Sequence, residues 1–215
     1  MSVRIKEAYA RWQEEENSAN QIAGSRFPPW HRKNSGSCDH RNQENAVPTA
    51  VTVPLAEYLA KTYHPDCDYL DGELLERNVG ELDHSRLQML IARYLSVREK
   101  RWGIIVVPEL RVQVKPTRFR IPDITVIAGL LPSTQILREP PFLCIEILSP
   151  RDSMNDMQER IDDYLNFGVP HVWVINPRNS RAFHYTADGM REPKDGILLT
   201  SSPPITLPIR DLENL

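Results

Sequence analysis

The spacing of hydrophobic positions changes near residue 50, and almost all of the predicted elements lie after that point. Residues 1–16 carry apolar side chains at helical spacing from Ile5 to Trp12. Residues 17–49 show no hydrophobic period and are rich in polar residues, so they cannot bury enough apolar surface to offset their ordering entropy. We therefore expect residues 1–50 to be an N-terminal extension that is largely disordered, followed by one domain over residues 51–215.

Two segments of this domain have the three- and four-residue spacing of helices that face a core. The first begins at Asp83, a candidate N-cap, ends near Gly103, and carries the apolar stripe Leu87, Leu90, Ile91, Tyr94 and Leu95. The second begins at Ser153, which with Asp156 resembles a capping box, and ends at Gly168. A shorter helix is predicted over residues 54–59.

The strands are predicted from alternation and from short apolar runs. Residues 68–77 form two runs around an Asp-Gly pair, which predicts a hairpin. Residues 110–115 alternate apolar and polar, as in a strand with one wet face, whereas residues 121–128 and 142–148 are apolar enough for central strands. Further strands are predicted over residues 104–107, 171–175, 182–185 and 197–200. The order of elements predicts an α/β fold with a mixed β-sheet flanked by helices.

Composition narrows the function classes. The net charge of −3 argues against a protein that coats nucleic acid, so a polyanion would have to meet a local basic patch. No apolar stretch is long enough for a transmembrane helix, and the first thirty residues do not resemble a secretory signal. The 3 cysteines form no metal-binding pair and cannot all be bridged, which favours a reduced, cytoplasmic protein. The lack of a transmembrane stretch favours a protein without a membrane partner.

Two acidic residues stand out because they lie within apolar strands. Asp123 follows Pro122 in the segment 121–128, and Glu146 lies inside Phe-Leu-Cys-Ile-Glu-Ile-Leu. A carboxylate buried in a central strand is costly unless it is paired or binds a metal ion. If the two strands are neighbours, both carboxylates can converge on a hard cation such as Mg²⁺. The alternative is that both are ordinary salt-bridged acids.

Other catalytic classes have weak support. There is no Gly-x-Ser-x-Gly nucleophile elbow and no glycine-rich phosphate loop. Cys144 lies in an apolar strand, where an inert core thiol is the simpler interpretation.

Several blocks together resemble the Uma family of restriction endonuclease-like proteins, a branch of the PD-(D/E)XK nuclease superfamily. These blocks are Asp-Tyr-Leu-Asp-Gly-Glu-Leu (68–74), the helix with His84, Arg-Ile-Pro-Asp-Ile (120–124), Pro-Phe-Leu-Cys-Ile-Glu-Ile-Leu-Ser-Pro (141–150) and Tyr-Leu-Asn-Phe-Gly-Val-Pro-His-Val-Trp-Val-Ile-Asn-Pro (164–177). The resemblance covers about residues 51–200. It implies a restriction-endonuclease-like core and a metal-dependent phosphodiesterase.

The resemblance also implies roles for individual residues. Asp123 and Glu146 would bind Mg²⁺ or Mn²⁺, with the backbone carbonyl of Ile147 as a further ligand. Glu73 would complete this shell directly or through water, and His84 would point inward at the edge of the site.

The sequence departs from the superfamily at the third catalytic element. A lysine is expected two residues after Glu146, but Leu148 stands there. In the Uma branch the lysine lies on the following helix, where this chain has Arg160. An arginine stays protonated and cannot act as a base, but it can bind a phosphate and stabilise transition-state charge. A structural alternative is that Arg160 pairs with Asp156 one turn earlier.

A basic cluster precedes Asp123 and could meet a phosphate backbone. Its members are Arg111, Lys115, Arg118 and Arg120, on a hairpin that leads into the predicted site. Solvated charge on that hairpin is the alternative.

Three hypotheses follow. The first is a metal-dependent endonuclease acting on nucleic acid, with DNA expected and a homodimer plausible because cutting both strands needs two sites. The second is a catalytically impaired nuclease fold that serves as a DNA-binding or interaction module, as the missing lysine suggests. The third is a scaffold whose acids are only structural.

Overall fold

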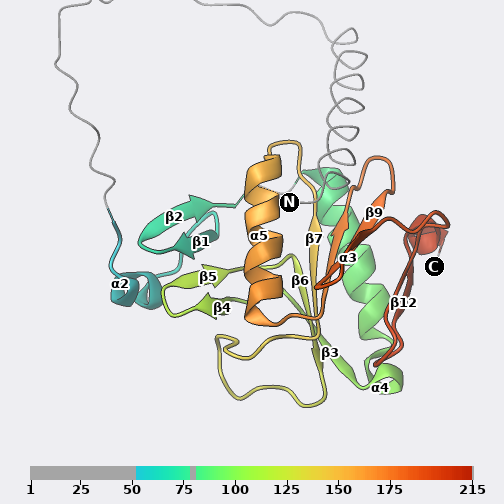
Figure 1. Cartoon of the computed structure of the whole chain (residues 1–215), viewed down its shortest axis with the longest axis horizontal. Coiled ribbons are helices and arrows are strands. Elements are labelled where there is room, and N and C mark those ends of the chain that lie inside the picture. The colour runs from blue at the N-terminus through green and yellow to red at the C-terminus, as the bar shows by residue number, and fades with distance from the viewer. Residues whose placement is uncertain (1–51, 78–80, 215) are drawn as a thin grey trace, which may run out of the picture. The chain divides into compact units, whose positions relative to one another are not determined.

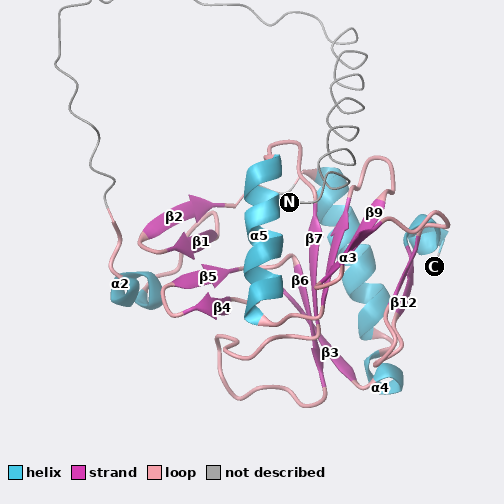
Figure 2. Cartoon of the chain, viewed as in Figure 1, coloured by secondary structure: helices cyan, strands magenta, loops and turns pink. Residues whose placement is uncertain are grey.

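The described residues form two larger β-sheets with one helix packed between them. The computed structural model describes residues 52–77 and 81–214, so the predicted extension 1–50 lies outside the described residues. A six-stranded sheet has the order β10-β9-β8-β7-β6-β3, a four-stranded sheet has the order β2-β1-β5-β4, and β11 and β12 form a small ladder. Figure 1 shows helix α5 between the four-stranded sheet and the six-stranded sheet, and Figure 2 shows helices on both sides of the latter.

The four-stranded sheet contains the predicted Asp-Gly hairpin. Its strands are β1 (Cys67–Leu70), β2 (Glu73–Glu76), β4 (Val112–Lys115) and β5 (Arg118–Arg120). Asp71 and Gly72 join β1 to β2 with φ angles of 53° and 109°, which are both positive as a two-residue hairpin turn requires. Its aromatic core holds Tyr58 of α2 (Leu55–Ala60), Tyr69 and Phe119. The hairpin prediction is confirmed.

The six-stranded sheet is mixed, as predicted. Its strands are β3 (Ile104–Pro108), β6 (Ile124–Ala128), β7 (Leu143–Ile147), β8 (His171–Ile175), β9 (Ala182–Thr186) and β10 (Gly189–Arg191). The pair β7–β8 is parallel and the other pairs are antiparallel. A parallel pair needs a crossover, and α5 (Met154–Phe167) provides it.

The two long helices cover opposite faces of this sheet. Leu90, Ile91 and Leu95 of α3 (Leu82–Ser96) pack in the main core with strand residues such as Ile145. Because side chains alternate along a strand, Glu146 points to the other face, toward α5. The sequence predicts one helix from Asp83 to near Gly103, but the structure divides this stretch into α3, which ends at Ser96, and a separate helix α4 (Glu99–Trp102). It is α4 that ends at Gly103, in the left-handed conformation.

The helix caps agree with prediction for α5 and differ for α3. The Ser153 hydroxyl accepts a hydrogen bond from the Asp156 N–H, and Gly168 ends α5 with φ 103°. In α3 the N-cap is Glu81 and Asp83 lies in the first turn, so Asp83 was wrong as the cap. A carboxylate favours the first turn almost as well, because it faces the positive end of the helix dipole.

The remaining elements close one end of the core. Strands β11 (Ile197–Leu199) and β12 (Thr206–Pro208) pair antiparallel, and the 3₁₀ helix η1 (Ile209–Asn214) follows them. Among the residues that the structure describes, no helix is long and apolar enough to cross a membrane.

Candidate active site

The two acidic residues predicted from buried strands lie next to one another at one end of the large sheet. Asp123 directly precedes β6, and Glu146 lies in β7. Ile124 pairs with Ile145 across these antiparallel strands, so Asp123 and Glu146 take the next opposed positions. Their exposed fractions are 2% and 0%. The two strands are thus neighbours, which is the condition under which both carboxylates could converge on one cation.

Asp123 is held by three groups from different parts of the chain. Arg77 Nη2 donates to its Oδ1, His84 Nε2 lies 3.3 Å from its Oδ2, and the Ile147 N–H donates to Oδ2 over 2.6 Å. Burial alone would raise the pKa of Asp123, but Arg77 and His84 outweigh it and hold that pKa below its usual value. In turn, burial opposes the charge of His84 while Asp123 raises its pKa, so the pair favours a carboxylate beside an imidazolium.

Glu146 is less well compensated. Its Oε1 accepts a hydrogen bond from Tyr164 over 2.6 Å, and its Oε2 accepts one from Arg160 Nη1 over 3.2 Å. Burial raises the pKa of Glu146 to about 7. Arg160 lowers this pKa, but the neighbouring charge of Asp123 raises it again and partly cancels the effect of Arg160. The two carboxylates therefore differ: Asp123 is held ionised, and Glu146 lacks enough positive charge.

A third buried carboxylate, Asp68 of β1, reaches the site through Arg160. Arg160 Nε lies 3.5 Å from Asp68 Oδ2, so one guanidinium bridges Asp68 and Glu146. The other partners of Asp68 are Arg120 Nη1 at 3.1 Å and the Ile121 N–H at 3.0 Å. Arg160 thus forms these two buried contacts, and not the pairing with Asp156 that was the structural alternative.

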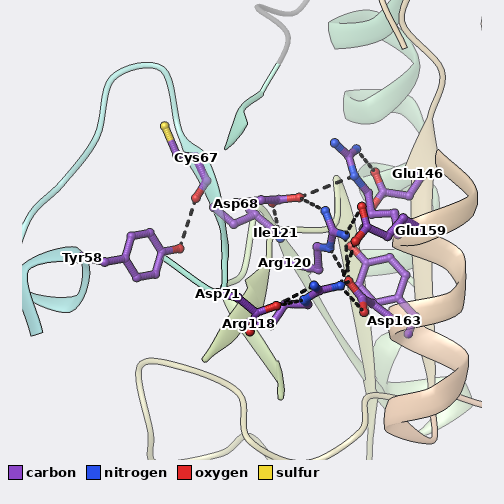
Figure 3. A network of polar contacts seen from close by, with 12 residues as sticks. Tyr58, Cys67, Asp68, Asp71, Arg118, Arg120, Ile121, Glu146, Glu159 and Asp163 are labelled. Atoms are coloured by element: carbon purple, nitrogen blue, oxygen red, sulfur yellow. Dashed lines mark hydrogen bonds and ion pairs between the residues drawn. The ribbon is translucent and has the colours of Figure 1, made fainter. Parts of the chain in front are cut away.

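Asp68 belongs to a network that joins the four-stranded sheet to α5 (Figure 3). Arg120 donates to Asp163 of α5 over 2.8 Å, and Arg118 donates both to Asp163 and to Asp71 of the hairpin turn. Arg118 also pairs with Glu159 at 2.8 Å. The network fixes the face of α5 that presents Arg160 and Tyr164 to Glu146.

The structure brings some of the predicted site residues together and leaves one apart. His84 and Ile147 both contact Asp123, although Ile147 does so through its N–H. Glu73 is exposed at the start of β2, and neither Asp123 nor Glu146 has it as a partner in the described residues. The acid that this hairpin delivers to the site is Asp68. Glu73 lies beside the turn, whereas Asp68 lies toward the other end of the hairpin ladder.

The basic cluster that precedes Asp123 is largely turned toward protein. Arg120 has an exposed fraction of 0% and lies between Asp68 and Asp163. Arg118 is paired as above, and the Arg111 guanidinium lies 4.6 Å from the centre of the Tyr58 ring. Lys115 keeps 47% of its side chain exposed while lying 3.2 Å from Asp163. Nucleic-acid contact by these four residues stays a prediction, and Arg120 has no surface to offer it.

Comparison with known proteins assigns the chain to a family. A family model described as "Uma2: Putative restriction endonuclease" matches residues 55–210. The chain belongs to the Uma2 family. A crystal structure of "a putative nuclease belonging to DUF820 from Anabaena variabilis ATCC 29413" has a TM-score of 0.65 and 24% sequence identity, over 75% of this chain and 98% of that one. This likeness shows the shared restriction-endonuclease-like fold. No curated protein matches significantly.

Membership of the Uma2 family supports a nuclease-like function with nucleic acid as the partner. It does not identify the residues that sequence reasoning missed, which are Asp68, Arg77 and Tyr164. Asp68 and Tyr164 each begin a block that resembles the family, at 68–74 and 164–177, and Asp68 also alternates with Tyr69 on a strand. Arg77 and Tyr164 look like a hairpin-end cation and a core aromatic, and only the fold brings them to the carboxylates.

Proposed function

We propose that this Uma2 family member is a divalent-metal-dependent nuclease that hydrolyses phosphodiester bonds of nucleic acid, with DNA as the expected substrate. The observation that carries the proposal is the pair of buried carboxylates, Asp123 and Glu146, at opposed positions on neighbouring strands with Arg160 beside them. A scaffold would gain little from such a pair, because burying two like charges together is unfavourable.

The donor set fits a hard divalent cation such as Mg²⁺ or Mn²⁺. Asp123 and Glu146 offer carboxylate oxygens, and the raised pKa of Glu146 marks a place where positive charge is lacking. The described residues contain no group of three or more His, Cys, Asp or Glu side chains arranged to hold a metal ion. Mg²⁺ commonly keeps several waters and takes only one or two carboxylates, so two suffice. The Ile147 carbonyl remains the expected further ligand.

The other side chains have separate tasks. The bound cation would supply charge neutralisation and a water of lowered pKa. Tyr164 fixes the orientation of Glu146 through its hydroxyl. Arg160, always protonated, would bind a phosphate oxygen and stabilise its developing charge. His84 Nδ1 is buried without a hydrogen-bond partner, so a protonated His84 has one N–H to donate to the phosphate or the leaving oxygen.

Cleavage assays test the proposal directly. The wild type and Asp123→Ala would be incubated with plasmid and single-stranded DNA in Mg²⁺ or Mn²⁺, with Glu139→Ala as an exposed-acid control. We expect cleavage by the wild type and the control and none above background by Asp123→Ala. Equal cleavage by Asp123→Ala would exclude this site, provided that circular dichroism shows both variants folded.

The alternative function is a nuclease fold that binds nucleic acid without cutting it. It is favoured by Leu148, which is buried where the superfamily has lysine, and by Arg160, which is held between two acids. Binding without cleavage across metals would support it, and Arg160→Lys would then be expected to raise cleavage.

Light scattering would test the homodimer expected for double-strand cutting.

A further inference from the structure

A basic pocket lies on α3 beside the candidate active site. Its volume is about 280 Å³, and its walls come from α3, the turn after β8 and η1. Three arginines, Arg86, Arg178 and Arg210, line it together with one acid, Asp83. We call it the α3 pocket. Three guanidinium groups around one hollow are typical of a site for an anion that presents several oxygens.

The α3 pocket adjoins the site along the chain and lies at the same ends of the strands. Asp83 lines the pocket, and the next residue, His84, contacts Asp123. β8 runs parallel to β7 with Ile175 opposite Ile147, so the turn that carries Arg178 follows the same strand ends as the site. Asp123 and Glu146 lie on the α5 side of the sheet and the pocket lies on the α3 side, so a nucleic-acid strand would pass over the ends of β7 and β8 to reach it.

The charges of the α3 pocket face solvent. Arg86 and Arg210 are exposed, and neither forms an ion pair with another residue in ranges 52–77 and 81–214. Arg178 is exposed but paired, with its Nη2 3.4 Å from Glu81 Oε2, so the charge that the pocket offers to a ligand comes mainly from Arg86 and Arg210. Asp83 offsets part of this charge. The balance still differs from that around Arg120, which is surrounded by buried acids.

We propose that the α3 pocket binds the phosphate backbone of the nucleic-acid strand whose scissile phosphodiester lies at Asp123 and Glu146. This inference rests on the proposed function. Arginine matches phosphate oxygens in two-point contacts, and contacts to phosphate position a strand without reading its sequence. The pocket therefore acts as a register-setting site beside the chemistry.

Salt-dependent binding tests the proposal. Binding of fluorescently labelled single- and double-stranded DNA to the full chain would be measured by anisotropy in EDTA, over a series of NaCl concentrations. Removing one cation that binds a phosphate reduces the slope of log K against log salt by about 1. The Arg86→Ala/Arg210→Ala variant should therefore lower the slope by about 2 and weaken binding. Arg86→Lys/Arg210→Lys should retain most of the slope.

The matched control removes the same charge elsewhere. Lys100→Ala/Arg101→Ala alters two exposed cations of α4, beyond the far end of α3, and should leave the slope nearly unchanged. Equal changes in the two double variants, or no binding of either DNA by the wild type, would overturn the proposal. Cleavage that persists with an unaltered slope in Arg86→Ala/Arg210→Ala overturns the pocket alone. A lowered slope in a protein that never cleaves supports the pocket and overturns the nuclease.

Discussion

Arg120 and Arg86 lie on two sides of the same site, and the fold uses their charges in opposite ways. Arg120 is buried between Asp68 and Asp163 and ties the four-stranded sheet to α5. Arg86 faces solvent in the α3 pocket. The difference shows that nearness to a site along the sequence does not decide whether an arginine faces solvent. What decides is the number of acids on the elements that pack against it.

The largest expected effect is the loss of stability when the buried arginine of this pair, Arg120, is replaced. Arg120→Met leaves Asp68 and Asp163 short of opposite charge inside the protein, so we expect a loss of about 3 kcal/mol or more in the free energy of unfolding. Arg86→Met, at an exposed position, should change it by no more than about 0.5 kcal/mol. Urea denaturation measures both. Equal effects would mean that the buried network contributes no more than surface charge does.

A second expectation concerns the undercompensated Glu146. Because the folded pKa is raised to about 7, above the ordinary 4.5, the folded state binds more protons than the unfolded state between these values. The contribution of Glu146 to the free energy of unfolding is fully present below pH 4.5 and is lost as the pH rises through 7. The wild type should therefore lose about 1–3 kcal/mol between pH 5 and pH 8 relative to Glu146→Gln.

This comparison is made in EDTA by urea denaturation at both pH values. Added Mg²⁺ should then stabilise the wild type more at pH 8 than at pH 5, and should not do so in Glu146→Gln. A stability difference between the two proteins that does not vary with pH would contradict the assigned charge state.

The smallest expected effect on the free energy of unfolding comes from comparing two acids of the same hairpin. Asp71 and Asp68 both accept hydrogen bonds from arginines, but the Asp71 side chain is 50% exposed and that of Asp68 is 1% exposed. Asp71→Asn should cost at most about 1 kcal/mol, and asparagine tolerates the positive φ of the turn. Asp68→Asn should cost clearly more by the same denaturation assay. A larger loss in Asp71→Asn would reverse the order of buried and exposed pairs.

The sequence was sufficient to predict the elements that have strong periodic or cap signals. The stripe from Leu87 to Leu95, the Ser153 cap and the Asp-Gly turn each depend on neighbours in the chain, and each is confirmed. Strand β6 begins at Ile124, later than the predicted 121, because Ile121 donates its N–H to the Asp68 side chain. Side-chain acceptors of that kind leave no periodic signal.

The candidate site was predictable only in part. Asp123 and Glu146 were found because a carboxylate in an apolar strand is conspicuous, and their proximity follows from neighbouring strands. Asp68 and Arg77 were missed because their partners lie 40 or more residues away. Arg120 was expected to be available to nucleic acid but is buried, for the same reason. Alternation along a three-residue strand does not reveal that a distant helix will bring Asp163 to it.

The bridge from Asp68 through Arg120 to Asp163 also predicts an order in which the chain folds. Arg120 lies 52 residues after Asp68, and Asp163 lies a further 43 after Arg120. During synthesis Asp68 and Arg120 emerge long before α5, so Asp68 lacks Arg160 and Arg120 lacks Asp163 until that helix is made. The four-stranded sheet can therefore close its charged side only when α5 docks. Native pairing across such sequence separations is slow, so the small sheet and the crossover helix should form together, as one late step.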